Sequence, residues 1–232
     1  MSNRRRTITG SGVRIEQIKD LPLGSKIMLS SGKTFLVQAK NVSGHQSNSV
    51  TLVSEFVTES YTWAVSWHSA YEYSDIHKSI MPKYYNELNQ TEKNAIIERS
   101  FEVGKELDGY GTPGVYFAKL SSHFWAPSGK ELGLSTGKGA NLGFTDNASR
   151  KKTLKNSVAS GYYTTSSYYY QYRNLDDNEY YVYVISSNGI EEKPKVIASS
   201  KRLTGFETGV LPCCDVKGDS ILRYKSGYWR FE

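Results

Sequence analysis

The sequence has few cysteines and no long apolar run. Cys213 and Cys214 are adjacent, and a disulfide between neighbours forces a strained ring, so we expect two small buried apolar side chains. The four histidines show neither H-E-x-x-H spacing nor a C-x-x-C partner, so no metal site is predicted. No stretch approaches the roughly 18 uncharged apolar residues that span a bilayer, and residues 1–6 precede no signal-peptide core. We therefore expect a protein that is not inserted in a membrane and is made in the cytoplasm.

The length and composition predict a folded chain. With 232 residues, of which 38% are hydrophobic and 13% aromatic, the chain can bury a core and is neither a disulfide mini-scaffold nor wholly disordered. We find no internal repeat, heptad pattern or collagen-like period in the sequence. The chain is therefore not expected to build a fibre shaft.

The net charge of +6 is concentrated near the N-terminus. Four arginines precede the first acidic residue, Glu16, and a second basic cluster lies in a Ser/Asn-rich stretch; the residues are Arg4, Arg5, Arg6 and Arg14, and Arg150, Lys151, Lys152 and Lys155. Neither group fits a known nucleic-acid-binding motif, so nucleic acid is not the expected partner. One interpretation is an ordinary solvated surface. The other is that residues 1–20 form a basic arm that anchors the protein on an acidic partner.

Apolar patterning predicts both strands and helices. Residues 25–29 and 34–39 flank a Ser-Gly turn and favour a β-hairpin, and residues 50–57 favour a third strand. Ser74 or Asp75 can cap a helix that carries Ile76 and Ile80. Thr91 with Glu92 begins a second helix that extends through residues 95–97.

Beyond residue 104 the chain is rich in Gly, Ser, Thr and Tyr. Strand-like runs occur at residues 115–120 and 180–185, and residues 209–216 with 221–224 suggest a closing hairpin. The whole predicts an α+β fold, with two helices against antiparallel strands and long irregular loops, in a single domain over residues 21–232.

Enzyme motifs are not supported by their context. Residues 109–114 fit G-x-G-x-x-G, but they precede a strand-like run where the dinucleotide fingerprint opens a helix. His68 with Asp75, or His123 with its neighbouring serines, has no accompanying G-x-S-x-G elbow. We expect neither a catalytic site nor a cofactor.

Tyrosine is the outstanding feature of the sequence. Nine of the 18 tyrosines lie between residues 162 and 183. Successive strand side chains point to opposite faces, so Tyr168, Tyr169 and Tyr170 cannot all enter one core. Two interpretations stay open: a tyrosine-rich core and oligomer interface, or a surface that recognises protein or glycan. The candidate binding residues are Tyr162, Tyr163, Tyr168, Tyr169, Tyr170, Tyr172 and Arg173.

Several short motifs follow one another along the chain. They are Leu21-Pro22-Leu23-Gly24-Ser25-Lys26, Tyr73-Ser74-Asp75-Ile76 with Leu88 and Ile96-Ile97, Val115-Tyr116-Phe117-Ala118-Lys119-Leu120-Ser121, Arg150 with Tyr162-Tyr163-Thr164-Thr165-Ser166, Asn188-Gly189 and Gly209-Val210-Leu211-Pro212. Their order resembles a domain of unknown function common in phages and prophages of Gram-positive bacteria. Two arginines of the family pattern are replaced, by Thr165 and Leu211.

The resemblance implies a C-type-lectin-like fold, as in sulfatase-modifying enzymes and phage receptor-binding proteins. It suggests a virion protein at the tail or baseplate, with the arm on other virion proteins and the tyrosine region on a host-surface glycan or protein. An alternative is a capsid or tail decoration subunit whose arm and tyrosines pack on neighbouring virion proteins, and we expect a homo-oligomer in either role. A formylglycine-generating oxidase is a third reading, but adjacent Cys213 and Cys214 do not resemble a copper-binding pair.

Overall fold

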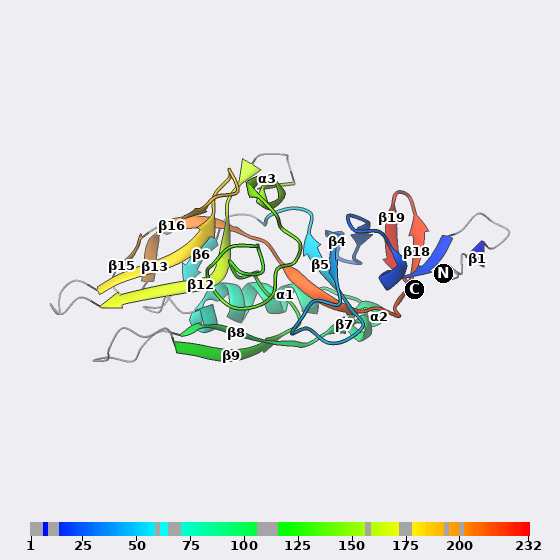
Figure 1. The fold of residues 1–232 in the computed structure, drawn as a ribbon, viewed down its shortest axis with the longest axis horizontal. Helices are drawn as coiled ribbons and strands as arrows, with labels where there is room; N and C mark the ends of the chain where they lie inside the picture. Colours follow the sequence, from blue (N-terminus) through cyan, green and yellow to red (C-terminus); the bar gives the residue numbers. More distant parts are fainter. Residues whose placement is uncertain are drawn as a thin grey trace.

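Strands, rather than helices, form most of the fold. The computed structural model (Figure 1) describes residues 7–8, 14–58, 61–64, 71–105, 116–155, 159–171, 178–192, 195–199 and 202–232. Within these ranges the chain forms nineteen strands and three α-helices of at most six residues. The expected α+β, C-type-lectin-like fold with two helices is therefore wrong, and the protein is mostly β.

The larger sheet joins strands from both ends of the sequence. Its nine neighbouring strands are, in order, β1 (Thr7–Ile8), β2 (Arg14–Gln17), β18 (Ile221–Lys225), β19 (Tyr228–Phe231), β3 (Lys26–Met28), β4 (Thr34–Lys40), β5 (Ser49–Ser54), β17 (Cys213–Lys217) and β7 (Ile96–Ile97). Every neighbouring pair is antiparallel except β19 and β3, which pair in parallel through Trp229 and Ile27. All six residues of β5 are buried, which is expected for a strand that has neighbours on both edges.

The hairpin expected around the Ser-Gly turn is confirmed. Strands β3 and β4 pair with Ile27 opposite Phe35, and Gly32 adopts φ 76°, a left-handed conformation that glycine takes without a steric cost. The closing hairpin was predicted between the wrong strands. β17 pairs with β5 and β7, whereas β18 turns back through Ser226 and Gly227 onto β19.

Part of the expected N-terminal arm belongs to the sheet. Residues 14–17 form β2, which pairs with β18, and the 3-10 helix η1 (Ile18–Asp20) follows it. Ile18 is completely buried in the core. The folded region therefore includes residues 14–20, and residues 1–6 and 9–13 of the arm lie outside the described ranges.

The helices are shorter than the sequence pattern predicts. A 3-10 helix, η2 (Tyr71–Tyr73), is followed by the π-helical turn η3 (Ile76–Ile80), which leads into α1 (Met81–Asn86). Helix α2 (Gln90–Ala95) begins at an Asn89 capping box and ends before Ile96, because the β-branched pair of β7 lies against β17 instead. A third helix, α3 (Asn147–Arg150), was not expected. No helix in the described residues is long and apolar enough to cross a membrane.

A second sheet contains the tyrosine-rich strand. Its order is β12 (Tyr162–Gln171), β13 (Asn178–Ile185), β15 (Lys195–Ser199), β16 (Arg202–Val210) and β6 (Tyr61–Ala64), and β14 (Glu191–Glu192) also pairs with β13. Strand β12 pairs in parallel with β16 as well, so four of these strands close on themselves. Two hairpins complete the fold, β8 (Arg99–Lys105) with β9 (Tyr116–Ser122) and β10 (Lys152–Thr153) with β11 (Ala159–Ser160). The strands expected near residues 115–120 and 180–185 are confirmed as β9 and β13.

Gly209 of β16 allows Val57 and Thr58 to pack closely against the backbone at the point where β16 pairs with β12. A Cβ atom at Gly209 would lie 2.0 Å from Cγ1 of Val57 and 2.9 Å from the carbonyl oxygen of Thr58. No side chain fits in that space. The glycine of the Gly209-Val210 motif therefore has a structural reason, independent of any ligand.

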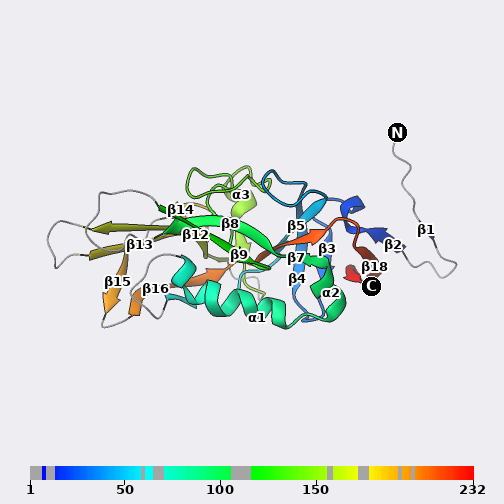
Figure 2. The same ribbon diagram turned by 90° about the horizontal axis from the view of Figure 1, so that it is seen from below.

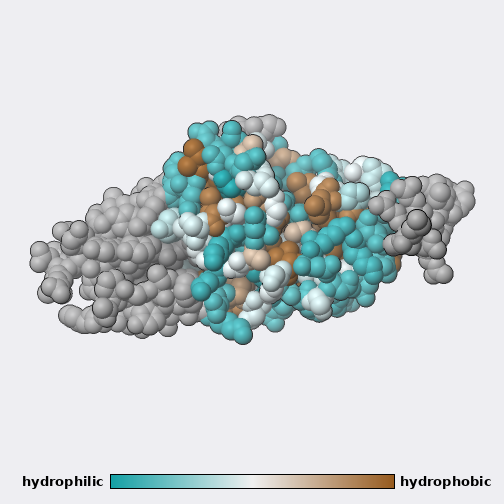
Figure 3. All heavy atoms as spheres, viewed as in Figure 1, coloured by the Kyte–Doolittle hydropathy of each residue, from teal (hydrophilic) through white to brown (hydrophobic). Residues whose placement is uncertain are grey.

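The molecule is elongated, with different elements at its two ends. Figure 1 shows β1, β2, β18 and β19 at one end, while β12 and β13 and the β8–β9 hairpin run toward the other. The view in Figure 2 agrees and places α1 along one side of the middle. On the face drawn in Figure 3, hydrophilic residues cover most of the coloured surface and hydrophobic residues form small separate groups.

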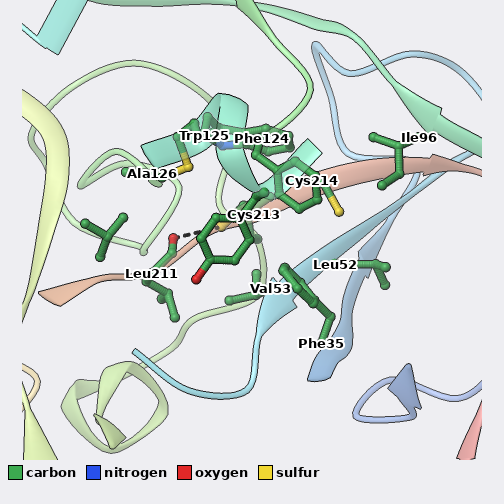
Figure 4. Close-up of a cluster of buried hydrophobic side chains, with 14 of the residues drawn as sticks. Phe35, Leu52, Val53, Ile96, Phe124, Trp125, Ala126, Leu211, Cys213 and Cys214 are labelled. Carbon is green, nitrogen blue, oxygen red and sulfur yellow. Dashed lines mark hydrogen bonds between the residues drawn. The ribbon is translucent and has the colours of Figure 1, made fainter. Parts of the chain in front are cut away.

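The core packs aromatic rings against β5 and β17. Figure 4 shows Phe35, Phe124 and Trp125 around Cys213 and Cys214, and the backbone of Trp125 exchanges two hydrogen bonds with Cys213, at 3.0 and 2.8 Å. Both thiols are free and buried, as the sequence predicted. Burial raises the pKa of each thiol, so both stay protonated and unreactive at neutral pH.

The boundary of the folded region can be tested within one short segment. We expect Ile18→Ala to lower the free energy of unfolding by about 2–4 kcal/mol, because it leaves a cavity under η1. Leu23→Ala is the matched control, since the Leu23 side chain is 64% exposed, and its effect should stay within about 0.5 kcal/mol. Urea unfolding followed by tryptophan fluorescence measures both. Equal stability of the two variants would place residues 14–20 outside the cooperative fold.

Candidate functional site

The first two tyrosines of β12 lie in the core. Tyr162 and Tyr163 are both fully buried, and the Tyr162 hydroxyl donates a hydrogen bond to the carbonyl oxygen of Arg150 at 2.9 Å. Burial raises the pKa of Tyr162 far above its ordinary value. These two rings stabilise the fold and are not part of an exposed binding surface, so the structure corrects their assignment as surface residues.

A bulge separates these core residues from the other tyrosines of β12. Tyr163 pairs with Val184 and Ser167 with Val182, so three residues of β12 lie opposite the single residue Tyr183. The hydroxyl of Thr164, within the bulge, donates to the carbonyl oxygen of Tyr183 at 2.9 Å. Bulges bend a strand and change the direction of its side chains. The tyrosine-rich stretch is therefore two structural units rather than one.

The second unit is residues 167–171, which we call the outer tyrosine segment. Its backbone pairs with β13, with Tyr168 opposite Tyr181, Tyr169 opposite Tyr180 and Tyr170 opposite Glu179. Tyr172 and Arg173 lie outside the described residues.

Of the expected anchoring residues, the structure describes one side chain. Arg14 forms an ion pair with Glu16 at 2.8 Å, and its guanidinium lies 5.2 Å from the centre of the Trp229 ring and 5.8 Å from that of Tyr224. About half of the side chain stays exposed. Arg4, Arg5 and Arg6 lie outside the described residues.

The second basic cluster does not form one surface. Arg150 is buried and donates hydrogen bonds to Gly189 O at 3.0 Å, Leu132 O at 3.2 Å and Asn147 Oδ1 at 2.5 Å. These hydrogen bonds hold the loops that contain Leu132 and Gly189 against α3. A Cβ atom at Gly189 would lie only 2.0 Å from the carbonyl oxygen of Asn147, so the junction is tightly packed. Lys151 and Lys155 are exposed, and burial lowers the pKa of Lys152.

The structure also reveals a buried polar group that the sequence analysis missed. Asp215 of β17 is fully buried and accepts a hydrogen bond from the Thr51 hydroxyl at 2.7 Å. Nδ1 of His45 lies 2.9 Å from Oδ2 of the same carboxylate. The His45 ring stands edge-on to Trp125 at 6.0 Å between centroids. A loop, β5 and β17 are thus joined by one carboxylate.

A buried ion pair lies on the other side of His45. Arg99 of β8 contacts Glu131 at 2.5 Å, and the second carboxylate oxygen of Glu131 accepts from the amide of Ser128 at 2.9 Å. The guanidinium of Arg99 lies 4.4 Å from the centre of the Trp125 ring. Nε2 of His45 is 3.9 Å from Glu131. A continuous series of contacts therefore joins four charged or ionisable side chains. We call these residues the buried charge network: Asp215, His45, Glu131 and Arg99.

The buried charge network borders a small cavity. The cavity has a volume of about 230 Å³ and is lined by Ser43, Gly44, Arg99, Ser100, Phe101, Glu102, Glu131, Lys138 and Gly139. In the described part of the chain, Nε2 of His45 has no hydrogen-bond partner, and the Thr51 hydroxyl, 3.3 Å from Nδ1, donates its hydrogen bond to Asp215. No hydroxyl or thiol of the described residues is therefore hydrogen-bonded to the free nitrogen of the Asp–His pair. We interpret the network as structural. No group of three or more metal-ligating side chains occurs among the described residues.

Of the two histidine sets considered in the sequence, the structure describes the histidine of one, His123. His123 stacks on Tyr85 with ring centroids 3.8 Å apart, and burial lowers its pKa, so the ring is neutral at pH 7. Asp75 precedes η3 and its side chain makes no capping hydrogen bond. His68 and residues 109–114 lie outside the described residues.

Two features of the sequence could have indicated the buried charge network. Asp215 interrupts an apolar run, and an ionisable residue in a buried strand requires a partner. Its partner His45 lies in a loop of Asn, Ser and Gly residues 170 positions away. Nothing local in the sequence connects the two.

A comparison with known families gives one match. The model of the family described as Domain of unknown function (DUF6273) matches residues 34–218, which extend from β4 to the turn after β17 and include the buried charge network. No curated protein and no solved structure matches the chain.

A structural role of the buried charge network predicts that removing one charge of a pair destabilises the protein more than removing both charges. Arg99→Met should lower the free energy of unfolding by about 3–5 kcal/mol, because it leaves Glu131 buried without its cation. The double variant Arg99→Met/Glu131→Met should recover most of that loss in urea unfolding. Arg14→Met is the control, because an exposed pair contributes about 1 kcal/mol or less. A double variant no more stable than Arg99→Met would contradict the role of charge burial.

Proposed function

The chain belongs to the family described as Domain of unknown function (DUF6273), and we propose that it is a phage virion protein that binds the host surface. Because the family description names no function, the proposal rests on the residues of the chain itself. In this proposal the N-terminal residues attach the protein to other virion proteins. The outer tyrosine segment contacts a glycan or protein on the host cell. The protein has no catalytic role, and it acts in several copies on the virion.

The separation of the two ends is the observation that carries the proposal. Strand β1, which directly follows Arg4, Arg5 and Arg6 in the sequence, pairs with β2 at one end of the molecule (Figure 1). Strands β12 and β13 run to the opposite end, in both views. A protein attached through its N-terminal residues would therefore direct the outer tyrosine segment away from the attachment point.

The chemistry of the outer tyrosine segment supports recognition. Tyrosine offers a large, stiff ring and a hydroxyl, so it gives contact area at low entropic cost. The register pairs Tyr168 with Tyr181 and Tyr169 with Tyr180, so four tyrosines occupy neighbouring positions of the β12–β13 pair. Tyr162 and Tyr163 support this segment from the core.

The location of the protein on the virion tests the proposal against the decoration alternative. We expect an antibody against the protein to label intact particles at the tail tip in electron microscopy. Label over the head or along the tail tube would instead support a decoration subunit. Particles without label would contradict both virion roles.

Alanine substitutions test the outer tyrosine segment. Tyr168→Ala with Tyr169→Ala removes two consecutive rings of the segment, so we expect binding to host cells to weaken at least about 30-fold, as for hot-spot aromatic residues worth about 2 kcal/mol or more. Tyr224→Ala is the matched control, because this tyrosine is 40% exposed and lies in β18 at the opposite end. Cell-binding assays and thermal unfolding are measured on the same samples. Unchanged binding by the double variant would exclude the segment as the contact surface.

A further inference from the structure

A cleft in the middle of the molecule is lined by four separate elements. Its volume is about 550 Å³, within the range of small-molecule sites. The walls are the β3–β4 turn, the end of β5 with the residues that follow it, the η3–α1 helix and the segment after β10. The lining residues used in the argument are Lys33, Val57, Ser79, Ile80, Lys83, Tyr84, Leu154 and Lys155. We call this site the lysine-rimmed cleft.

The charged residues at the rim have one sign. Lys33, Lys83 and Lys155 line the cleft, and no acidic residue is among the described residues that do. Glu87, outside the lining, contacts Lys33 and lies 4.0 Å from Lys83. Lys155 has no ion-pair partner in the described part of the chain. One carboxylate beside three ammonium groups leaves an excess of positive charge that favours an anion.

The floor of the lysine-rimmed cleft is apolar and already ordered. Ile80 and Tyr84 are 7% and 9% exposed, and Val57 is 4% exposed. Lys33 Nζ lies 4.5 Å above the Tyr84 ring, so the aromatic face is covered by the cation rather than open for stacking. Lys83 keeps 71% of its side chain exposed and can move toward a ligand without loss of packing. An apolar floor below mobile cations fits a ligand with an apolar body and an anionic group.

We propose that the lysine-rimmed cleft binds a small organic anion that consists of a ring and one phosphate, sulfonate or carboxylate group. The ring covers Val57, Ile80 and Leu154, and the anionic group contacts Lys83 and Lys155. Hydroxyls at the rim, such as that of Ser79, add polar contacts at the edge of the ring. This site is separate from the outer tyrosine segment, and the inference does not depend on the proposed virion role.

The probe for this site is 8-anilinonaphthalene-1-sulfonate, which has aromatic rings and one sulfonate. We expect calorimetric titration of the intact protein to show one saturable site. Lys83→Gln with Lys155→Gln should raise the dissociation constant about three- to tenfold, the effect of removing two exposed ion pairs. Amide shifts in NMR spectra should concentrate at Gly32, Ser79 and Lys155.

A matched variant separates direct contact from a general charge effect. Lys151→Gln with Lys225→Gln removes the same charge from two exposed lysines outside the cleft, and the dissociation constant should change by less than about twofold. Equal weakening in both double variants would overturn the proposal, as would unchanged affinity in the Lys83/Lys155 variant. Uncharged N-phenyl-1-naphthylamine should bind at least about three times more weakly; equal affinity would also overturn the requirement for an anion. Urea unfolding of each variant confirms an intact fold.

Discussion

Burial of charge constrains the way the larger sheet, the β8–β9 hairpin and two loops fit together. Asp215, Glu131 and Arg99 are each less than 8% exposed, and a charge taken out of water costs several kcal/mol unless it is paired and hydrogen-bonded. Each partner comes from a different segment: Thr51 from β5, His45 from a loop, and Ser128 from a second loop. The buried charge network is satisfied only when β17, β5, β8 and both loops are in place together.

The irregular region between β9 and β12 is held by the same kind of contact. Arg150 donates to three oxygens from α3 and two loops, and Gln38 of β4 donates to Leu142 O at 3.0 Å. Glu131 also accepts, through its backbone, a hydrogen bond from the amide of Leu142 at 2.8 Å. A stretch that reads as a polar loop in the sequence is thus fixed by specific hydrogen bonds to the sheets. Between β9 and α3, these contacts give the chain a unique conformation without a helix or a named strand.

Local features of the sequence were predicted well, and long-range features were not. The β3–β4 hairpin follows from apolar runs on either side of a Ser-Gly turn, and the buried cysteines follow from their apolar neighbours. The prediction that the second helix extends through residue 97 was wrong, because Ile96 and Ile97 pair with Val216 and Asp215 as a strand of the larger sheet. Here pairing in the tertiary structure outweighs the helix propensity of the segment. The fold class was wrong as well, because the pairings that assemble the sheets join residues far apart in the sequence and leave no periodic signal; examples are β2 with β18, β5 with β17 and β6 with β16.

The candidate site shows the same division. The alternation of strand side chains predicted that consecutive tyrosines cannot share one face. No pattern in the sequence predicted the bulge at residues 164–166, which separates the core tyrosines from the outer tyrosine segment. Arg150 was counted with its lysine neighbours as surface charge, although its side chain is buried. The lysine-rimmed cleft assembles Lys33, Lys83 and Lys155 from three distant segments, so no sequence motif could reveal it.

The order of strands in the larger sheet has a consequence for biosynthesis. Strand β5 ends at Ser54, and its neighbour β17 begins only at Cys213. At roughly 5–20 residues per second, the ribosome needs on the order of ten seconds or more to make the intervening segment. During that time β4 and β5 have been synthesised, but the edge of β5 that later pairs with β17 has no partner strand. This part of the sheet therefore forms only after β17 has been synthesised, and until then the free edge of β5 is open to pairing with another chain.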